Sequence, residues 1–319
     1  MDKHRRERMP TKKRVPAQFM KYFKCLTLVL ATVWPFAGTA HASPCSRATV
    51  KIDPMLDGRI RIPVTVEGHT LSLLLDTGGV VTTIKWERAK ELGLPVLQSV
   101  KKVGGVGGSL LNFYVTAQNV SVGGQRVENR PIYIESRNLP DADGTLGSDI
   151  LRDYDVEIDL AHGTLSLTPP YSCAESVGTS IAMDVVQDGH IRLPVKLDGR
   201  SIVATFDSGS AVSLLPMKAA GLLDIFPNSA ALALVGSSGP YQIYAHPFQS
   251  LEFGDIAIKN PRILIVSDSF IPETASALVL GMDAVRQMHF IIAYGEKRFF
   301  ILPETDPEPD ASRPLTPPP

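Results

Sequence analysis

The sequence predicts an all-β protein built from two similar lobes, and three observations carry that prediction. A segment that starts at Ile60 recurs 131 residues later at Ile191, with seven of twenty positions identical and no gap. Each copy alternates apolar and polar residues and then turns at a glycine, which is the pattern of a β-hairpin. The length of 319 residues also fits two domains of ordinary size.

The two hairpins are expected at equivalent places in the repeat. Residues 60–66 and 71–75 form the first around the turn Glu67-Gly68. Residues 191–197 and a strand that ends at Phe206 form the second around Asp198-Gly199. The repeat register slips by three residues later on, so that the segment 146–149 aligns with 280–283. Homologous halves explain this agreement better than two unrelated domains do.

Short helices and glycine-rich tips are predicted to follow each hairpin. A helix over Trp86 to Leu92, with Gly93 as its C-cap and Trp86 in the core, has a weaker counterpart at 217–220 that ends at Gly221. Glycine-rich stretches at 104–108 and 236–240 are typical of mobile hairpin tips that fold over a cleft. The tip positions of interest are Gly105, Val106, Gly107, Ser237 and Ser238.

The chain ends suggest export and a tail. A basic leader precedes the apolar run 25–37 and the small-residue pattern Ala40-His41-Ala42, which predicts a signal peptide over 1–42 with cleavage after Ala42. A retained N-terminal anchor is the alternative. The N-terminal lobe is expected over 43–170, the C-terminal lobe over 171–303, and a disordered Pro-rich tail over 304–319. The protein should therefore be periplasmic or secreted.

Charge and cysteine content agree with export. The leader holds 9 Lys and Arg against 2 Asp and Glu, which leaves 23 and 31 in the remainder and a net charge of -8. Such a chain has no positive field that would attract nucleic acid. Outside the leader, Cys45 and Cys173 form an even pair and predict a disulfide, with two buried free thiols as the alternative.

The candidate catalytic residues are expected at the end of the second hairpin strand in each half. Asp76-Thr77-Gly78 and Asp207-Ser208-Gly209 occupy equivalent repeat positions, so a pseudo-twofold axis would bring the two aspartates together. Two adjacent carboxylates cannot both ionise cheaply and hold one proton between them. One can then take a proton from water while the other donates to the carbonyl oxygen.

These residues resemble the pepsin and retropepsin clan of aspartic proteases. The resemblance rests on Leu75 to Gly78, Phe206 to Gly209 and the later segments 145–151 and 279–285, and it covers about residues 50–302. It implies a closed β fold in each lobe, a cleft between the lobes, and endopeptidase activity on extended peptides. It also implies that Thr77, Gly78, Ser208, Gly209 and Ser210 support the catalytic pair Asp76 and Asp207.

One position departs from the family pattern. Gly79 follows the first tripeptide, where the family usually has Ala, Ser or Thr, whereas the second loop has the expected Ser210. We interpret Gly79 as tuning the pair. A non-enzymatic peptide-binding module that has lost the chemistry is the alternative, and an obligate homodimer with four Asp loops is a third possibility. Asp149 and Asp283 are expected to cap short helices.

Other reaction classes have little support in the sequence. The seven histidines show no zinc-ligand spacing, a Gly-x-Ser-x-Gly elbow is missing, and the glycine-rich stretches lack the Lys of a phosphate loop. No metal and no cofactor are therefore predicted. The expected protein is a monomeric pseudo-dimer, an exported aspartic endopeptidase that processes or regulates another protein, with a protein or peptide bound in extended form.

Overall fold

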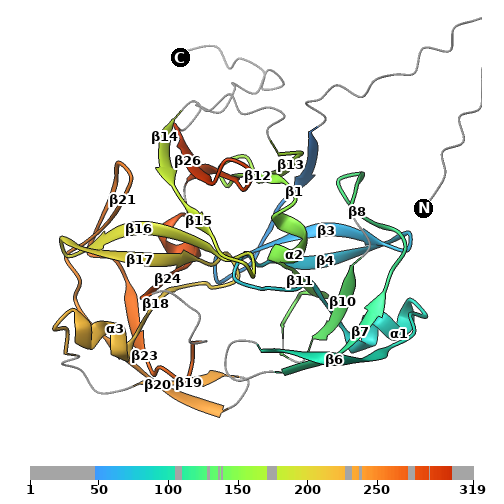
Figure 1. Cartoon of the computed structure of the whole chain (residues 1–319), viewed down its shortest axis with the longest axis horizontal. Coiled ribbons are helices and arrows are strands. Elements are labelled where there is room, and N and C mark those ends of the chain that lie inside the picture. Colours follow the sequence, from blue (N-terminus) through green and yellow to red (C-terminus); the bar gives the residue numbers. More distant parts are fainter. Residues whose placement is uncertain are drawn as a thin grey trace, which may run out of the picture. The chain divides into compact units, whose positions relative to one another are not determined.

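The computed structural model describes residues 47–104, 110–127, 130–135, 137, 139–170, 178–226, 232–236, 239–271, 277–286 and 288–303. Residues 42–319 form one compact unit. Its described part is almost entirely β structure arranged in three sheets (Figure 1). The predicted all-β class is therefore confirmed.

The first half of the chain forms a ten-stranded sheet. Its strand order is β6-β7-β10-β5-β11-β4-β3-β8-β9, and β2 pairs with β3. The strands are β2 (Asp53–Pro54), β3 (Ile60–Val66), β4 (His69–Leu75), β5 (Thr83–Lys85), β6 (Leu97–Gly104), β7 (Leu110–Thr116), β8 (Val120–Val122), β9 (Gln125–Arg126), β10 (Pro131–Glu135) and β11 (Gly144–Leu146).

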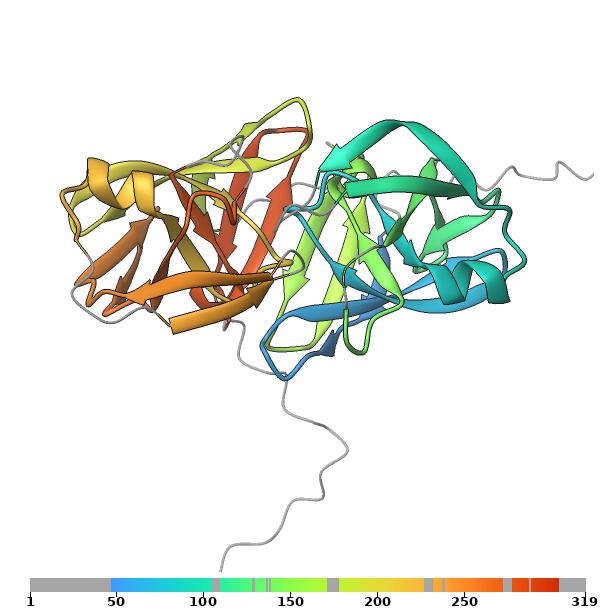
Figure 2. The same ribbon diagram turned by 90° about the horizontal axis from the view of Figure 1, so that it is seen from below.

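The second half repeats this sheet strand for strand. The order is β19-β20-β23-β18-β24-β17-β16-β21-β22, with β15 paired to β16. The strands are β15 (Asp184–Val185), β16 (Ile191–Leu197), β17 (Arg200–Phe206), β18 (Ser213–Pro216), β19 (Leu232–Gly236), β20 (Gly239–Ala245), β21 (Ser250–Phe253), β22 (Ile256–Lys259), β23 (Ile263–Val266) and β24 (Leu278–Leu280). Figure 2 shows the two sheets side by side.

Both predicted hairpins form, and their turns explain why the repeat keeps a glycine there. Glu67 and Gly68 have φ of 48° and 81°, and Asp198 and Gly199 have φ of 48° and 76°. Two successive residues with positive φ are the signature of a type I′ turn, which favours glycine at the second position. Alternate residues of β3, including Ile62 and Val64, are fully buried in the core.

The described residues include three short α-helices and one 3-10 helix, which accompany the sheets: α1 (Trp86–Glu91), α2 (Ser148–Leu151), α3 (Met217–Leu222) and η2 (Met282–Ala284). Helix α3 does not end at Gly221 as predicted. The left-handed residue that terminates it is Asp224, with φ of 55°, at the position equivalent to Gly93, with φ of 65°. Aspartate tolerates this conformation, so the glycine is needed at neither place.

The placement of Trp86 in the core is wrong. Its side chain is 43% exposed and packs edge-on against Phe113 of β7, with ring centroids 6.4 Å apart. Helix α1 buries only Ala89. A six-residue helix has too little surface to bury a tryptophan at its first position as well.

A third sheet joins the two halves and was not predicted. Its order is β1-β13-β12-β25-β26-β14, so each half supplies three strands. These are β1 (Ala48–Lys51), β12 (Asp155–Asp159), β13 (Thr164–Thr168), β14 (Thr179–Ala182), β25 (His289–Ala293) and β26 (Arg298–Leu302). At the seam β12 pairs antiparallel with β25, and Glu157 faces Ile291, its own repeat equivalent.

Several predictions fall on residues that the structure does not describe. These are the leader, the cysteines Cys45 and Cys173, the domain boundary near 170, the hairpin-tip residues Gly105, Val106, Gly107, Ser237 and Ser238, and the tail 304–319. They remain predictions. The hairpin arms themselves are present as β6 with β7 and β19 with β20.

Candidate active site

The two Asp loops lie between the ten-stranded sheets, where the sequence placed them. Asp76 directly follows β4 and its backbone N–H donates to Leu146 O of β11, at 3.0 Å. Asp207 follows β17 and donates to Leu280 O of β24 at the same distance. Strands β4 and β17 pair in parallel with β11 and β24, which fixes the height at which each carboxylate emerges.

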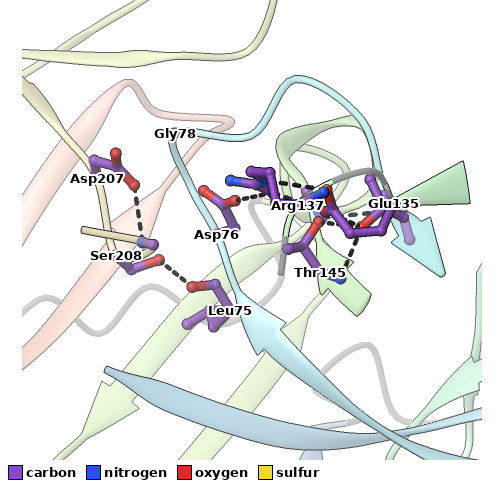
Figure 3. A network of polar contacts seen from close by, with 12 residues as sticks. Leu75, Asp76, Gly78, Glu135, Arg137, Thr145, Asp207 and Ser208 are labelled. Atoms are coloured by element: carbon purple, nitrogen blue, oxygen red, sulfur yellow. Dashed lines mark hydrogen bonds and ion pairs between the residues drawn. The ribbon is translucent and has the colours of Figure 1, made fainter. Parts of the chain in front are cut away.

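Thr77 and Ser208 lock the two loops together through reciprocal hydrogen bonds. The N–H of Thr77 donates to Ser208 Oγ at 3.0 Å, and the N–H of Ser208 donates to Thr77 Oγ1 at 2.9 Å. Each hydroxyl then donates to a carbonyl of the opposite strand, Thr77 to Phe206 O at 3.1 Å and Ser208 to Leu75 O at 2.9 Å. Both side chains are fully buried. The pair therefore holds the aspartates in fixed register, and Figure 3 shows the bond from Ser208 to Leu75.

Gly78 and Gly209 each pack against the carboxylate of the opposite lobe. A Cβ on Gly78 would overlap the carboxyl group of Asp207, and one on Gly209 would overlap that of Asp76. The backbone at both residues has no positive φ, so its conformation does not require glycine. Glycine is needed at both positions because the opposite carboxylate leaves no room for a Cβ. Gly79 also lies against Asp76, because a Cβ there would be 2.9 Å from its Cγ.

The two carboxylates differ in their surroundings. Asp76 is 4% exposed, and Oδ2 lies 3.7 Å from Nη2 of Arg137. Asp207 accepts the N–H of Gly209 at 2.8 Å. Desolvation and the charge of Asp76 raise the pKa of Asp207 to about 7, although the Gly209 hydrogen bond, His190 and Arg137 oppose the shift. Asp207 thus holds a proton under mildly acidic conditions.

Arg137 and Glu135 are site residues that the sequence analysis missed. Arg137 donates to Glu135 from its backbone N–H at 2.8 Å, from Nε at 3.1 Å and from Nη2 at 2.9 Å. Thr83 also donates to Glu135 at 2.9 Å. Burial alone would raise the pKa of Glu135, but its bonds to Arg137 hold it below the usual value. The sequence contained one indication of this pair. Glu135 and Arg137 are both charged, whereas Val266, the repeat equivalent of Glu135, is apolar.

A second pair of residues crosses between the lobes at equivalent positions. His190 Nε2 donates to Gly78 O at 2.7 Å, and Arg59 Nη1 donates to Gly209 O at 3.5 Å. Each of these side chains also contacts an aspartate, His190 at 3.1 Å from Asp188 and Arg59 at 2.7 Å from Asp57. We call these contacts the two latches.

Asp149 and Asp283 were expected to cap short helices, and the structure supports this only in part for Asp149. Its Oδ1 accepts the backbone N–H of Ile150 in the first turn of α2, at 3.0 Å. Neither α2 nor η2 has a bond from the side chain of its N-cap residue. Asp149 also accepts the hydroxyl of Thr82 at 2.8 Å, and Asp283 accepts that of Ser213 at 2.7 Å. Both carboxylates therefore make tertiary contacts to the segment that follows the Asp loop.

Ser210 is placed differently from the other support residues. Its hydroxyl donates to Val212 O at 2.8 Å. Ser210 therefore stabilises the loop backbone, and this hydroxyl does not donate to the carboxylate of Asp207. The glycine at position 79 therefore lacks a loop hydrogen bond of this kind. This difference affects loop rigidity on the Asp76 side.

Among the residues that the structure describes, no helix is long and apolar enough to cross a membrane. Within the same residues, no group of three or more His, Cys, Asp and Glu side chains is arranged to hold a metal ion.

Comparisons with known proteins agree with this geometry. The family model described as aspartyl protease matches residues 62–150 and 193–284, one match in each half. A solved structure of an aspartic proteinase from Irpex lacteus superposes with a TM-score of 0.51 at 13% identity, over 81% of this chain and 97% of that one, and shows the shared fold. No curated protein matches the sequence significantly. The chain belongs to the aspartyl protease family.

Proposed function

We propose that this protein is an aspartic endopeptidase whose dyad, Asp76 and Asp207, activates water for the hydrolysis of peptide bonds. The reciprocal bonding of Thr77 and Ser208 carries the proposal, since it brings the two carboxylates together within one chain. A pair of turn aspartates with only local roles would not need this interlock. Membership of the aspartyl protease family supports the same chemistry.

The reaction needs one ionised and one protonated carboxylate. The ionised one takes a proton from water, whose oxygen forms a bond to the carbonyl carbon, while the other gives its proton to the carbonyl oxygen. The proton taken from water then passes to the amide nitrogen as the C–N bond breaks, and the second carboxylate regains its proton from the gem-diol. The raised pKa of Asp207 suits a group that keeps a proton near pH 6.

The substrate is an extended protein or peptide segment that crosses the dyad. Extended peptides bind to exposed strand edges through main-chain hydrogen bonds. The hairpins β6–β7 and β19–β20 lie at the ends of their sheets and offer such edges. The predicted tip residues Gly105, Gly107 and Ser237 lie outside the described residues.

We further propose that the protein acts outside the cytoplasm as a monomer, on another exported protein. The predicted leader over 1–42 and the two cysteines support export. Because both Asp loops of the dyad come from one chain, a second copy is not needed to complete it. Processing or regulatory cleavage fits this setting better than bulk digestion.

The test is cleavage of a diverse peptide library by the protein purified from expression of the full-length chain, across pH 3 to 8. Cleavage should be blocked by a statine-type inhibitor and lost in Asp76→Asn and in Asp207→Asn. Thr77→Ser is the matched control, since it keeps the hydroxyl and should keep activity. N-terminal sequencing of the product checks cleavage after Ala42, and size-exclusion chromatography checks the monomer.

Two results would overturn the proposal. Full activity in either single Asp variant would exclude a shared dyad. The second result is binding without cleavage. If an extended peptide protects the folded protein against thermal unfolding, but is recovered intact at every pH, the protein is a peptide-binding module.

A further inference from the structure

The two lobes carry opposite chemistry at one equivalent position beside the dyad. Strand β10 pairs in parallel with β5, with Glu135 opposite Lys85, and β23 pairs in parallel with β18, with Val266 opposite Pro216. Glu135 and Val266 are thus equivalent, and both are buried. Two residues further on, the N-terminal lobe has Arg137 and the C-terminal lobe has Asp268.

Only one of these pairs contacts a carboxylate of the dyad among the ion pairs of the described residues. Arg137 Nη2 lies 3.7 Å from Asp76 Oδ2, whereas Asp268 accepts the backbone N–H of Lys218 at 2.8 Å. The Arg137 side chain is 27% exposed, and its guanidinium is held in place by the two side-chain bonds to Glu135. In Figure 3, Asp76 lies between Asp207 and Arg137.

The other basic side chains around the dyad come as a repeat-equivalent pair. His190 and Arg59 contact the carbonyls of Gly78 and Gly209, one from each lobe, and each has an aspartate partner. Of these two, only His190 is among the groups that lower the pKa of Asp207. Arg137 and Glu135 differ from this pair, because their repeat equivalents are Asp268 and Val266.

We propose that Arg137, held by Glu135, is a positioning residue that stabilises the ionised form of Asp76 and so makes Asp76 the general base and Asp207 the general acid. The inference rests on the proposed function. In the reaction, Asp76 then takes the proton from water and later gives it to the amine. Asp207 donates its proton to the carbonyl oxygen and recovers it when the gem-diol collapses.

Burial supports the same assignment for the proton. Desolvation and the charge of Asp76 raise the pKa of Asp207 to about 7. The bonds to Glu135 and the charges of Asp76 and Asp207 keep the pKa of Arg137 above its usual value despite its burial, so the guanidinium stays charged. A proton shared by the dyad therefore resides on the carboxylate further from the cation.

The test uses two substitutions that must act in opposite directions. Arg137→Gln leaves the Glu135 charge beside the dyad, so both limits of the pH profile of kcat/KM should move to higher pH. Glu135→Gln leaves Arg137 uncompensated, so both limits should move to lower pH. A single charge at this separation shifts carboxylate titration by about 1–3 pH units. A merely structural pair would lower activity in both variants and leave the limits in place.

Two further variants control the comparison. Arg137→Lys keeps the cation and should restore the wild-type limits, although its activity will fall with the loss of the two-point contact to Glu135. Asp268→Asn changes the equivalent residue of the C-terminal lobe and should leave the profile unchanged. Thermal unfolding of each variant shows whether it is folded.

A second measurement does not depend on turnover. The carboxyl carbons of 13C-labelled aspartate, assigned with Asp76→Asn and Asp207→Asn, report the titration of the dyad directly. In Arg137→Gln the dyad should hold its proton to higher pH. An unchanged titration would overturn the inference even if the wild type cleaves peptides, whereas a wild type that cleaves nothing but titrates as expected would overturn only the proposed function.

Discussion

The layer of side chains beside the dyad is polar in the N-terminal lobe and apolar in the C-terminal lobe. Thr83 bonds to Glu135 at 2.9 Å and to the hydroxyl of Thr145, also at 2.9 Å. The equivalent positions of the other lobe are Leu214, Val266 and Val279, which belong to one apolar cluster. The strand registers are the same in both lobes. The backbone therefore tolerates either layer, provided that its own polar groups are satisfied.

This comparison separates fold from function within one molecule. The features that the halves share, the hairpins, the Asp loops and the Thr77–Ser208 interlock, are those that build the dyad. The features in which they differ, above all Glu135 and Arg137, change its electrostatics without changing its geometry. The two lobes thus share one backbone scaffold but differ in the charged side chains that they place beside the dyad.

The largest expected effect comes from moving the glutamate to the other lobe. Val266→Glu would bury a carboxylate that has no arginine beside it, because position 268 is Asp. A buried carboxylate of this kind costs about 5 kcal/mol at pH 8, from a titration shift of about 3–5 units at 1.36 kcal/mol each. Urea unfolding at pH 8 measures the loss, with Val266→Leu as control. A loss within about 1 kcal/mol of that control would show that the apolar layer accepts charge.

The next effect is a stability gain from removing the protonated carboxylate. The pKa of Asp207 is raised from 3.8 to about 7, so the folded protein holds a proton that the unfolded chain releases. Stability should therefore fall as the pH rises from about 4 to 7. Asp207→Asn lacks this slope and should be more stable at pH 8, by on the order of 4 kcal/mol at 1.36 kcal/mol per pKa unit. Equal pH slopes for wild type and variant in thermal unfolding would contradict the raised pKa.

A smaller effect tests the polar layer itself. Thr83→Val gives the N-terminal lobe an apolar residue like Leu214, but it removes a donor to Glu135 and the acceptor for the backbone N–H of Thr145 at 3.0 Å. Buried groups that lose a partner cost about 1–3 kcal/mol each. Thr83→Ser keeps the hydroxyl and should lose less. Chemical denaturation measures the free energy of unfolding of both variants. Equal values for Thr83→Val and Thr83→Ser would mean that water replaces the lost hydrogen bonds.

The smallest effect distinguishes the two latches. The His190 contact to Gly78 O is 2.7 Å long and the Arg59 contact to Gly209 O is 3.5 Å. Replacing His190 with Phe should destabilise the protein by about 1 kcal/mol, and Arg59→Met by less, because hydrogen bonds weaken at the longer distance. A larger loss for Arg59→Met in the same unfolding assay would reverse the order.

The sequence predicted the parts of the site that depend on local pattern. Alternation and a turn glycine gave both hairpins, and the repeat gave the equivalence of Asp76 and Asp207. It did not predict Arg137, because the contact to Asp76 depends on the parallel pairing of β10 with β5, strands that are separated by some 45 residues. Aligning Glu135 with Val266 at the repeat offset would have drawn attention to it.

The short helices show a different limit. Their positions were predicted, and Asp149 does accept a backbone N–H of its own helix, from Ile150. The additional tertiary contacts of Asp149 and Asp283 were not predicted. Here each carboxylate bonds to a strand some 70 residues away. Competition between a local cap and a tertiary partner is decided by packing, which the local pattern does not contain.

The seam between β12 and β25 has a consequence for a half expressed alone. Glu157 faces Ile291, its repeat equivalent, across this seam. If two identical N-terminal halves paired through the same edge, Glu157 would face a second Glu157, and like charges directly opposite each other are destabilising. Because the two linked halves differ in sequence, Glu157 instead accepts a hydrogen bond from His289 at 2.8 Å.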